Sequence, residues 1–267
     1  MYSLNKLLTT EKSSTSSTDL LFTPQPNPDA FFRLICFSYA GGTSDIYLPW
    51  ASQLSTNVEL VVCQLPGRSS RLMEAPYLCI EPLIADLITA IKPLVNKPLI
   101  FFGHSMGSKI AYELLLAMRE HYLPTPLHFI VSACGAPQLP RRRPAINKLP
   151  DALFIIALSR LNGTPISILK NAEVMQLVLP ALRADFSLIE NYSHLNKKPI
   201  DTSLTLLGGT EDTVIDQEDL LAWQDLMINT SVNTTTIEWI AGDHFFIKSN
   251  PKAVVHCINQ LLLNQRN

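Results

Sequence analysis

The chain has 267 residues, of which 47% are hydrophobic and 16% charged, with a formal net charge of −2. This length suits one large α/β domain or at most two small ones, and the charge gives no basis for nucleic-acid binding. The five cysteines lie in apolar segments without metal-ligand spacing, no apolar run is as long as a membrane span, and no signal-peptide pattern opens the chain. We therefore expect a soluble, cytoplasmic protein with buried, reduced thiols.

The chain opens with residues 1–29, which are rich in Ser, Thr and Pro and are predicted to form a flexible N-terminal tail. One α/β domain is expected over 30–267. Its apolar runs predict strands at 31–37, 58–65, 99–103, 127–133, 203–207 and 235–240. Helical spacing predicts helices at 46–54, 80–95, 108–118, 220–228 and 251–263. Because strands and helices alternate, we expect a mostly parallel central sheet flanked by helices.

Residues 138–196 interrupt this alternation. They contain no convincing strand, while their apolar residues recur at helical spacing. A helical block inserted between two strands is typical of a lid over the carboxyl edge of the sheet, where ligands bind in such folds. A packing subdomain without a gating role is the alternative.

The strand at 99–103 runs into Gly-His-Ser-Met-Gly at 103–107, and a helical pattern follows at once. This strand–turn–helix context is that of a nucleophile elbow, in which a serine hydroxyl projects from a strained turn. The two glycines fit the turn because a side chain at either place would collide with the neighbouring strand or helix. Ser105 is therefore the predicted nucleophile.

Two further residues follow expected strands directly. Asp212 comes after the fifth of them, with Glu211 as the competing acid, and His244 comes after the sixth. The carboxyl ends of parallel strands meet at one edge, so these residues can share a site with Ser105. The order Ser, acid, His is that of the α/β-hydrolases. In that arrangement the histidine takes the serine proton, and the acid fixes the imidazole tautomer.

The other histidines are not expected to be catalytic. His104 is adjacent to the nucleophile and cannot reach round to it productively. The remaining ones are assigned to helix, strand or lid surfaces: His121, His128, His194 and His256.

Several segments leave two interpretations open. The loop at 38–42 is either a plain glycine turn or the source of a backbone oxyanion donor. Arg68 and Arg71 either anchor a loop through salt bridges or attract an anionic ligand. The run Arg141-Arg142-Arg143 is solvated charge by default, and an acidic protein partner is the alternative. Ion pairing is the expected role of two lid residues, Arg183 and Asp185.

Seven segments in order carry a family resemblance: 37–42 (FSYAGG), 65–71 (LPGRSSR), 103–107 (GHSMG), 163–165 (GTP), 182–186 (LRADF), 208–212 (GGTED) and 242–246 (GDHFF). Together they make the chain resemble the type II thioesterases, the stand-alone hydrolases of non-ribosomal peptide and polyketide assembly lines. The resemblance runs from about residue 34 to the C-terminal helix. Two small departures are Ser38, where Pro is common, and Ser70, where the family often has an acid.

The resemblance implies an α/β-hydrolase fold with a helical lid and a proofreading thioesterase. Such an enzyme clears stalled or misprimed acyl groups from the phosphopantetheine arm of an acyl or peptidyl carrier protein. It implies Ser105, His244 and Asp212 as the catalytic triad, with the backbone N–H groups of Ala40 and Met106 as oxyanion donors. This chemistry needs no metal or bound organic cofactor, and nothing in the residues demands more than a monomer.

The residues without the family support only a serine hydrolase with a helical lid, because one triad and one oxyanion hole serve thioesters and oxygen esters alike. A carboxylesterase or lipase-like enzyme acting on free small esters therefore stays open. A non-catalytic hydrolase fold used as a binding module is a third interpretation, which the intact Ser105, Asp212 and His244 disfavour.

Overall fold

The computed structural model describes residues 20–195, 198–228 and 234–264. They form a seven-stranded sheet in the order β1-β3-β2-β4-β5-β6-β7, in which β1 is antiparallel to β3 and all other neighbours are parallel. The strands are β1 (Leu21–Phe22), β2 (Phe32–Phe37), β3 (Val58–Cys63), β4 (Leu99–His104), β5 (His128–Ser132), β6 (Ser203–Gly209) and β7 (Thr235–Ile240). All six strands expected from the apolar runs are present.

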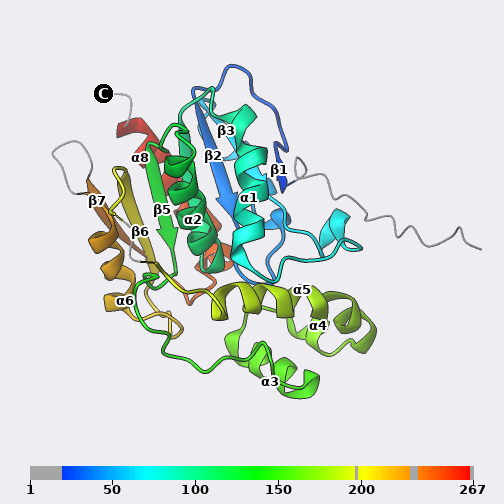
Figure 1. Cartoon of the computed structure of the whole chain (residues 1–267). Helices are drawn as coiled ribbons and strands as arrows, with labels where there is room; N and C mark the ends of the chain where they lie inside the picture. Colours follow the sequence, from blue (N-terminus) through cyan, green and yellow to red (C-terminus); the bar gives the residue numbers. More distant parts are fainter. Residues whose placement is uncertain (1–19, 196–197, 229–233, 265–267) are drawn as a thin grey trace, which may run out of the picture.

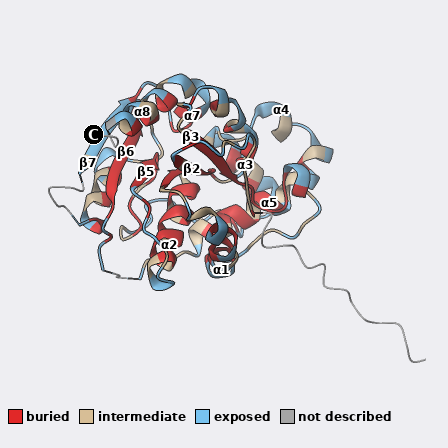
Figure 2. Ribbon diagram, turned by 90° about the horizontal axis from the view of Figure 1, so that it is seen from above, coloured by how far each residue is buried: buried red, intermediate tan, exposed pale blue. Residues whose placement is uncertain are grey.

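The sheet is covered on both faces, which explains why its central strands are continuous apolar runs rather than alternating ones. Helices α1 (Ile80–Ile91) and α2 (Met106–Glu120) pack together on one face, and α8 (Pro251–Asn264) covers the other (Figures 1 and 2). Two short helices, α6 (Gln217–Leu221) and α7 (Phe246–Ser249), follow β6 and β7. In Figure 2 the buried residues concentrate in the strands and on the inward sides of these helices.

Prolines shorten two of the expected helices. The region predicted as one helix at 46–54 forms two 3-10 turns, Ser44–Ile46 and Leu48–Ser52, the second with Pro49 in its first positions. The helix predicted at 80–95 ends at Ile91 and passes into a 3-10 turn that contains Pro93. The remaining 3-10 turns are Ser69–Arg71 and Ala222–Leu226.

The boundary predicted between the tail (1–29) and the domain lies too late in the chain. Its residues 1–19 lie outside the described part of the chain. From residue 20 on, however, the chain belongs to the fold, because the Leu20 side chain is fully buried and Leu21–Phe22 pairs with β3. The apolar triplet Leu20-Leu21-Phe22 supplies that burial, and the polar residues before it obscured the signal.

The helical insertion expected at 138–196 is present between β5 and β6. It consists of α3 (Asp151–Leu161), α4 (Ile166–Leu169) and α5 (Ala172–Glu190). These helices have a small apolar core of their own around Phe154 and Phe186. Figure 1 shows them at the end of the sheet towards which the arrowheads of β2 and β5 point, which is its carboxyl edge.

The cysteines are all free, and they are less uniformly buried than expected. Cys36, Cys63 and Cys134 are buried, whereas Cys257 is half-buried and Cys79 is exposed. Cys79 is exposed because it lies just before α1, at a turn rather than on the inward face of the helix. Within the described residues, the helices are too short or too polar to cross a membrane.

Candidate active site

Ser105 sits in the tight turn between β4 and α2, with φ of 53° and ψ of −116°. A positive φ is rare for a residue with a side chain. The neighbouring glycines make the turn possible. A Cβ on Gly103 would lie 2.4 Å from the Cα of Ser108, and one on Gly107 would lie 2.0 Å from the backbone oxygen of Phe37. The strand–turn–helix geometry expected for a nucleophile elbow is therefore present.

The three residues predicted to share a site lie within hydrogen-bond distance of one another. His244 Nε2 is 3.0 Å from Ser105 Oγ, and His244 Nδ1 is 2.8 Å from Asp212 Oδ2. The side chains of His244 and Asp212 are only 6% and 5% exposed. Glu211, the competing acid, is exposed, and its backbone N–H binds the Gly242 carbonyl. Asp212, rather than Glu211, is therefore the acid that is hydrogen-bonded to His244.

The parallel register of the sheet brings these residues together. Gly103 of β4 lies opposite Phe37 of β2. Ser132 of β5 lies opposite His104 of β4 on one side and Leu207 of β6 on the other. The strands therefore end level with one another, and the loops that follow β2, β4, β6 and β7 meet at one edge. The order of strands reverses between β2 and β4, and ligands bind at such switch points.

Asp212 is held as a carboxylate. Burial alone would raise its pKa, but hydrogen bonds from His244 and from the backbone N–H groups of Val214 and Ile215 lower the pKa below its ordinary value. An ionised carboxylate only accepts hydrogen bonds. His244 Nδ1 therefore carries a hydrogen and donates it to Asp212, and Nε2 faces the Ser105 hydroxyl.

His104 has a positional role that the sequence analysis missed. Its Nε2 lies 2.9 Å from the backbone oxygen of His244, and its Nδ1 lies 2.8 Å from Ser132 Oγ. Burial lowers the pKa of His104 to about 3, so its ring is neutral. Nε2 must then donate to the His244 carbonyl, while Nδ1 accepts from Ser132. The residue before the nucleophile thus fixes the backbone of the neighbouring histidine.

The loop after β2 forms a tight turn beside the elbow. The Gly42 N–H donates to the Tyr39 carbonyl at 2.8 Å, and Gly41 has φ of 80°. A positive φ at the third position is the mark of a type II turn. Ala40 lies in this turn, and Met106 is the first residue of α2, where backbone N–H groups have no acceptor within the helix. These are the two residues expected to donate to an oxyanion.

Arg68 and Arg71 both form ion pairs, the first of the two interpretations considered for them. Arg68 makes a bidentate pair with Asp185, with N–O distances of 2.6 and 2.7 Å. Arg71 pairs with Glu74 and donates to the Gln64 carbonyl. Asp185 is buried on α5, whereas Arg183 pairs with Asp151 at the start of α3. Both lid residues are thus ion partners, as expected.

The arginine run at 141–143 binds groups of the chain itself. Arg142 is exposed and pairs with Asp216 and Asp219, whereas Arg141 and Arg143 donate to the carbonyls of Glu190 and Thr213. His128, expected on a surface, is buried and contacts Thr205 Oγ1 at 2.8 Å. It begins β5, a central strand covered on both faces, and this position accounts for its burial.

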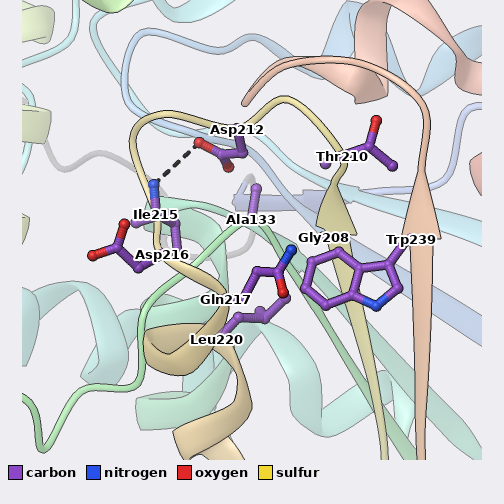
Figure 3. Close-up of a pocket in the computed structure, with 10 residues that line it drawn as sticks. Ala133, Gly208, Thr210, Asp212, Ile215, Asp216, Gln217, Leu220 and Trp239 are labelled. Carbon is purple, nitrogen blue, oxygen red and sulfur yellow. Dashed lines mark hydrogen bonds between the residues drawn. The ribbon is translucent and has the colours of Figure 1, made fainter.

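A pocket opens beside Asp212 at the carboxyl ends of β6 and β7 (Figure 3). The exposed ring of Trp239 forms one wall and covers Gly208, where a Cβ would lie 2.2 Å from the indole. Ser105 and His244 lie outside its lining, which comprises Ala133, Gly208, Gly209, Thr210, Asp212, Ile215, Asp216, Gln217, Leu220 and Trp239. This pocket is therefore separate from the Ser105 hydroxyl.

Known proteins are similar to this chain over most of its length. The family model for the thioesterase domain matches residues 32–262. The protein named linear gramicidin dehydrogenase LgrE, from Brevibacillus parabrevis, is 36% identical over 255 residues, covering 94% of this chain and 95% of LgrE. Its name describes a dehydrogenase, whereas the matching family model is that of a hydrolase.

Solved structures of thioesterases have the same fold. The RedJ thioesterase of the prodiginine pathway in Streptomyces coelicolor is 31% identical, with a TM-score of 0.81 over 88% of this chain and 92% of RedJ. YbtT, a type II thioesterase from the yersiniabactin pathway, is 28% identical, with a TM-score of 0.78 over 90% of this chain and 97% of YbtT. Fold class and family resemblance are thereby confirmed: the chain belongs to the thioesterase family, whose members are thioester hydrolases of α/β-hydrolase fold.

Proposed function

We propose that this thioesterase hydrolyses acyl groups from the phosphopantetheine arm of carrier proteins, with Ser105, His244 and Asp212 as its catalytic triad. The observation that carries the proposal is the continuous hydrogen-bonded line from Asp212 through His244 to Ser105, which ends on a strained elbow at the carboxyl edge of the sheet. Ser105 is partly exposed, so its hydroxyl is within reach of an acyl group.

In the first half of the reaction, Ser105 Oγ attacks the thioester carbonyl carbon while His244 Nε2 takes the hydroxyl proton. The backbone N–H groups of Ala40 and Met106 donate hydrogen bonds to the carbonyl oxygen and stabilise the negative charge that develops on it. The carbon–sulfur bond then breaks, and His244 returns the proton to the departing thiolate. Asp212 stabilises the imidazolium during both proton transfers.

In the second half, His244 takes a proton from a water molecule as the water oxygen attacks the acyl–Ser105 ester. The same two N–H groups stabilise the second oxyanion. Collapse of this intermediate breaks the bond between the acyl carbon and Ser105 Oγ, and the serine recovers its proton from His244. The products are the free acid and the carrier with its thiol restored.

The helical insertion is the part of the chain placed to hold the acyl group and to meet the carrier. It lies over the carboxyl edge of the sheet (Figure 1). Its turn at Gly163 packs on the Phe245 ring next to His244, and the Lys248 ammonium donates to the Gly163 carbonyl at 3.2 Å. YbtT, by its title, belongs to a combined peptide and polyketide pathway, and carrier-bound acyl groups are the intermediates of that class of pathway.

The test compares three substrates at equal concentration: an acetyl-phosphopantetheinyl carrier protein, acetyl-CoA and a p-nitrophenyl ester. The Ser105→Ala variant serves as the control for uncatalysed turnover. We expect kcat/KM to be highest for the carrier-bound thioester, and turnover of all three substrates to be lost in Ser105→Ala. A faster reaction with the free ester would instead identify a carboxylesterase with the same triad. Unchanged hydrolysis in Ser105→Ala would refute the assignment of the nucleophile.

A further inference from the structure

Asp185 is a buried carboxylate close to the proposed oxyanion hole that the reaction described above does not use. It lies on α5 of the insertion, and its side chain is 1% exposed. One of its oxygens accepts from Arg68 at 2.6 Å, and the other accepts from both Arg68 and the backbone N–H of Gly41 at 2.7 Å. The carboxylate thus joins α5 to two loops at the edge of the sheet.

The Gly41 N–H is the amide that decides the conformation of the Tyr39–Gly42 turn. Type I and type II turns differ by rotation of the peptide unit between their two central residues, which here is the unit joining Ala40 to Gly41. Asp185 accepts from that unit and favours the orientation found, with Gly41 at φ of 80°. Arg68 also donates to the Gly42 carbonyl at 3.1 Å, so the pair contacts both sides of Gly41.

Packing of α5 against these loops leaves the turn little freedom to move. A Cβ added to Gly41 would lie 2.6 Å from the Leu182 side chain, and one added to Gly67 would lie 3.0 Å from the Cβ of Ala181. Ala181, Leu182 and Asp185 are on one stretch of α5, so this stretch forms a fixed wall behind the turn.

The positive charge of Arg68 compensates the negative charge of Asp185. A buried negative charge beside an oxyanion hole would destabilise the negative charge that forms there. The Arg68 side chain is 8% exposed, and its guanidinium contacts both oxygens of Asp185, which neutralises the carboxylate at short distance. Burial alone would lower the pKa of Arg68, but Asp185 raises it above its ordinary value, so the arginine remains charged.

From these contacts we propose that Asp185 and Arg68 are positioning residues, which hold the Tyr39–Gly42 turn so that the Ala40 N–H faces the oxyanion. The inference rests on the proposed function, in which Ala40 is one of the donors. It also divides the insertion. The stretch of α5 around Asp185 belongs to the rigid frame of the site, whereas α3 and α4 make no hydrogen bond or ion pair with this turn among the described residues.

The test replaces the pair by apolar residues of similar volume in the double variant Asp185→Leu/Arg68→Met. Such replacements of a buried ion pair are often compatible with folding. We expect kcat to fall about 10- to 100-fold, somewhat less than removal of an oxyanion donor, while KM changes by less than about twofold. A trifluoromethyl ketone, which forms an oxyanion adduct with the serine, should lose affinity by the same factor as kcat/KM.

Two further variants separate positioning from stability. Asp185→Asn keeps an oxygen that accepts from the Gly41 N–H but leaves Arg68 without its anion. It should lower Tm more than the double variant and yet keep more of kcat. As a matched control, Arg33→Met/Glu59→Leu removes an ion pair of similar burial at the amino ends of β2 and β3. It should lower Tm without changing kcat.

A folded double variant with unchanged kcat, or with a change in KM alone, would overturn the inference, as would a kcat that simply follows Tm across the variants. If the double variant does not fold, Asp185→Ala is compared with Asp185→Asn. Both leave Arg68 unpaired, and equal kcat values would overturn the inference. All measurements use a p-nitrophenyl ester and the ketone. They therefore remain decisive even if the carrier-bound thioester proves not to be the preferred substrate.

Discussion

The carboxyl edge of the sheet and the helical insertion differ in how far their side chains are buried. At the edge, His244 and Asp212 are almost completely buried, and their hydrogen bonds follow from the register of parallel strands. The insertion instead exposes large apolar side chains, with Leu153 51%, Ile156 47% and Ile166 63% exposed. The sheet therefore fixes the proposed catalytic residues, and the insertion offers apolar surface that a substrate or partner can cover.

Among the contacts between these two regions, two lie beside residues of the proposed site. Asp185 of α5 binds Arg68 and the turn that contains Ala40. Gly163, between α3 and α4, packs on Phe245 directly after His244. Changes in the sheet, or in the stretch of α5 around Asp185, should therefore affect the chemical step or the stability of the whole chain. Changes at the exposed apolar residues of α3 and α4 should instead affect substrates selectively.

The largest expected effect is on the sheet side, at the acid of the proposed triad. Asp212→Asn should lower kcat by about 10³- to 10⁴-fold, because the histidine loses both its fixed tautomer and the charge that stabilises its protonated form. Steady-state kinetics with acetyl-CoA measure the loss. Glu211→Gln is the matched control, since Glu211 is exposed and adjacent, and it should leave kcat unchanged. A reversed result would mean that the acid has been misassigned.

The next largest effect is expected when a glycine is replaced by alanine, a change that can be made once beside the sheet and once in the insertion. Gly107→Ala places a methyl group 2.0 Å from the backbone oxygen of Phe37, which cannot move without shifting β2. It should reduce the free energy of unfolding by about 3 kcal/mol or more. In Gly163→Ala the methyl group meets the Phe245 ring at 2.7 Å, and a side chain can turn away. That loss should be below about 1.5 kcal/mol. Urea denaturation compares them, and equal losses would contradict the distinction.

Acid should weaken the sheet through its buried neutral histidines. Burial lowers the pKa of His104 to about 3 and that of His128 to about 4. Between these values and the ordinary value near 6.5, the unfolded chain binds protons that the folded chain does not. Stability therefore falls as pH decreases below about 6.5, by about 1.4 kcal/mol per pH unit for each histidine.

Thermal or urea unfolding between pH 7 and pH 5 measures this slope. His128→Gln should reduce the slope by the contribution of one proton, and it leaves the Ser105 site untouched. A slope that is the same in the wild type and in His128→Gln would show that His128 is not the group responsible.

The smallest effect is expected at the arginine run next to the insertion. Replacing Arg141, Arg142 and Arg143 together by Ala should raise KM for a carrier-bound substrate by about two- to fivefold at low salt, and less at high salt. The effect is modest because Arg142 is already paired with Asp216 and Asp219. KM for acetyl-CoA should not change. An equal rise for both substrates would argue against a docking role.

The sequence alone indicated most of the sheet and the members of the site, because those signals are local. Apolar runs predict six strands, and Ser105, Asp212 and His244 each follow one of them in the sequence. The edge strand Leu21–Phe22 was missed because two residues are too few to show a period. The helix expected at 46–54 was wrong because Pro49 favours a short 3-10 turn there.

Contacts between distant residues were harder to predict. Ion pairing is the predicted role of Asp185 and one of the two interpretations of Arg68, yet 117 positions separate them and nothing local shows that they pair with each other. The sequence excludes His104 as the catalytic base and gives no sign of any other role for it. Its contact with the His244 carbonyl spans 140 positions and exists only because β4 and β7 end at the same edge. Such pairings depend on the assembled sheet, which the residue pattern describes only in outline.

The point at which the insertion leaves and rejoins the sheet has a consequence for how such a protein can diversify. The chain departs after β5 and returns at β6, so the helices of the insertion contribute no residue to the register of the strands. If Asp185 remains, the neighbouring turn keeps its contact with α5. Evolution or an engineer can therefore vary the exposed residues of α3 and α4, provided that the buried Phe154 and Leu158 and the close packing of Gly163 on Phe245 are kept.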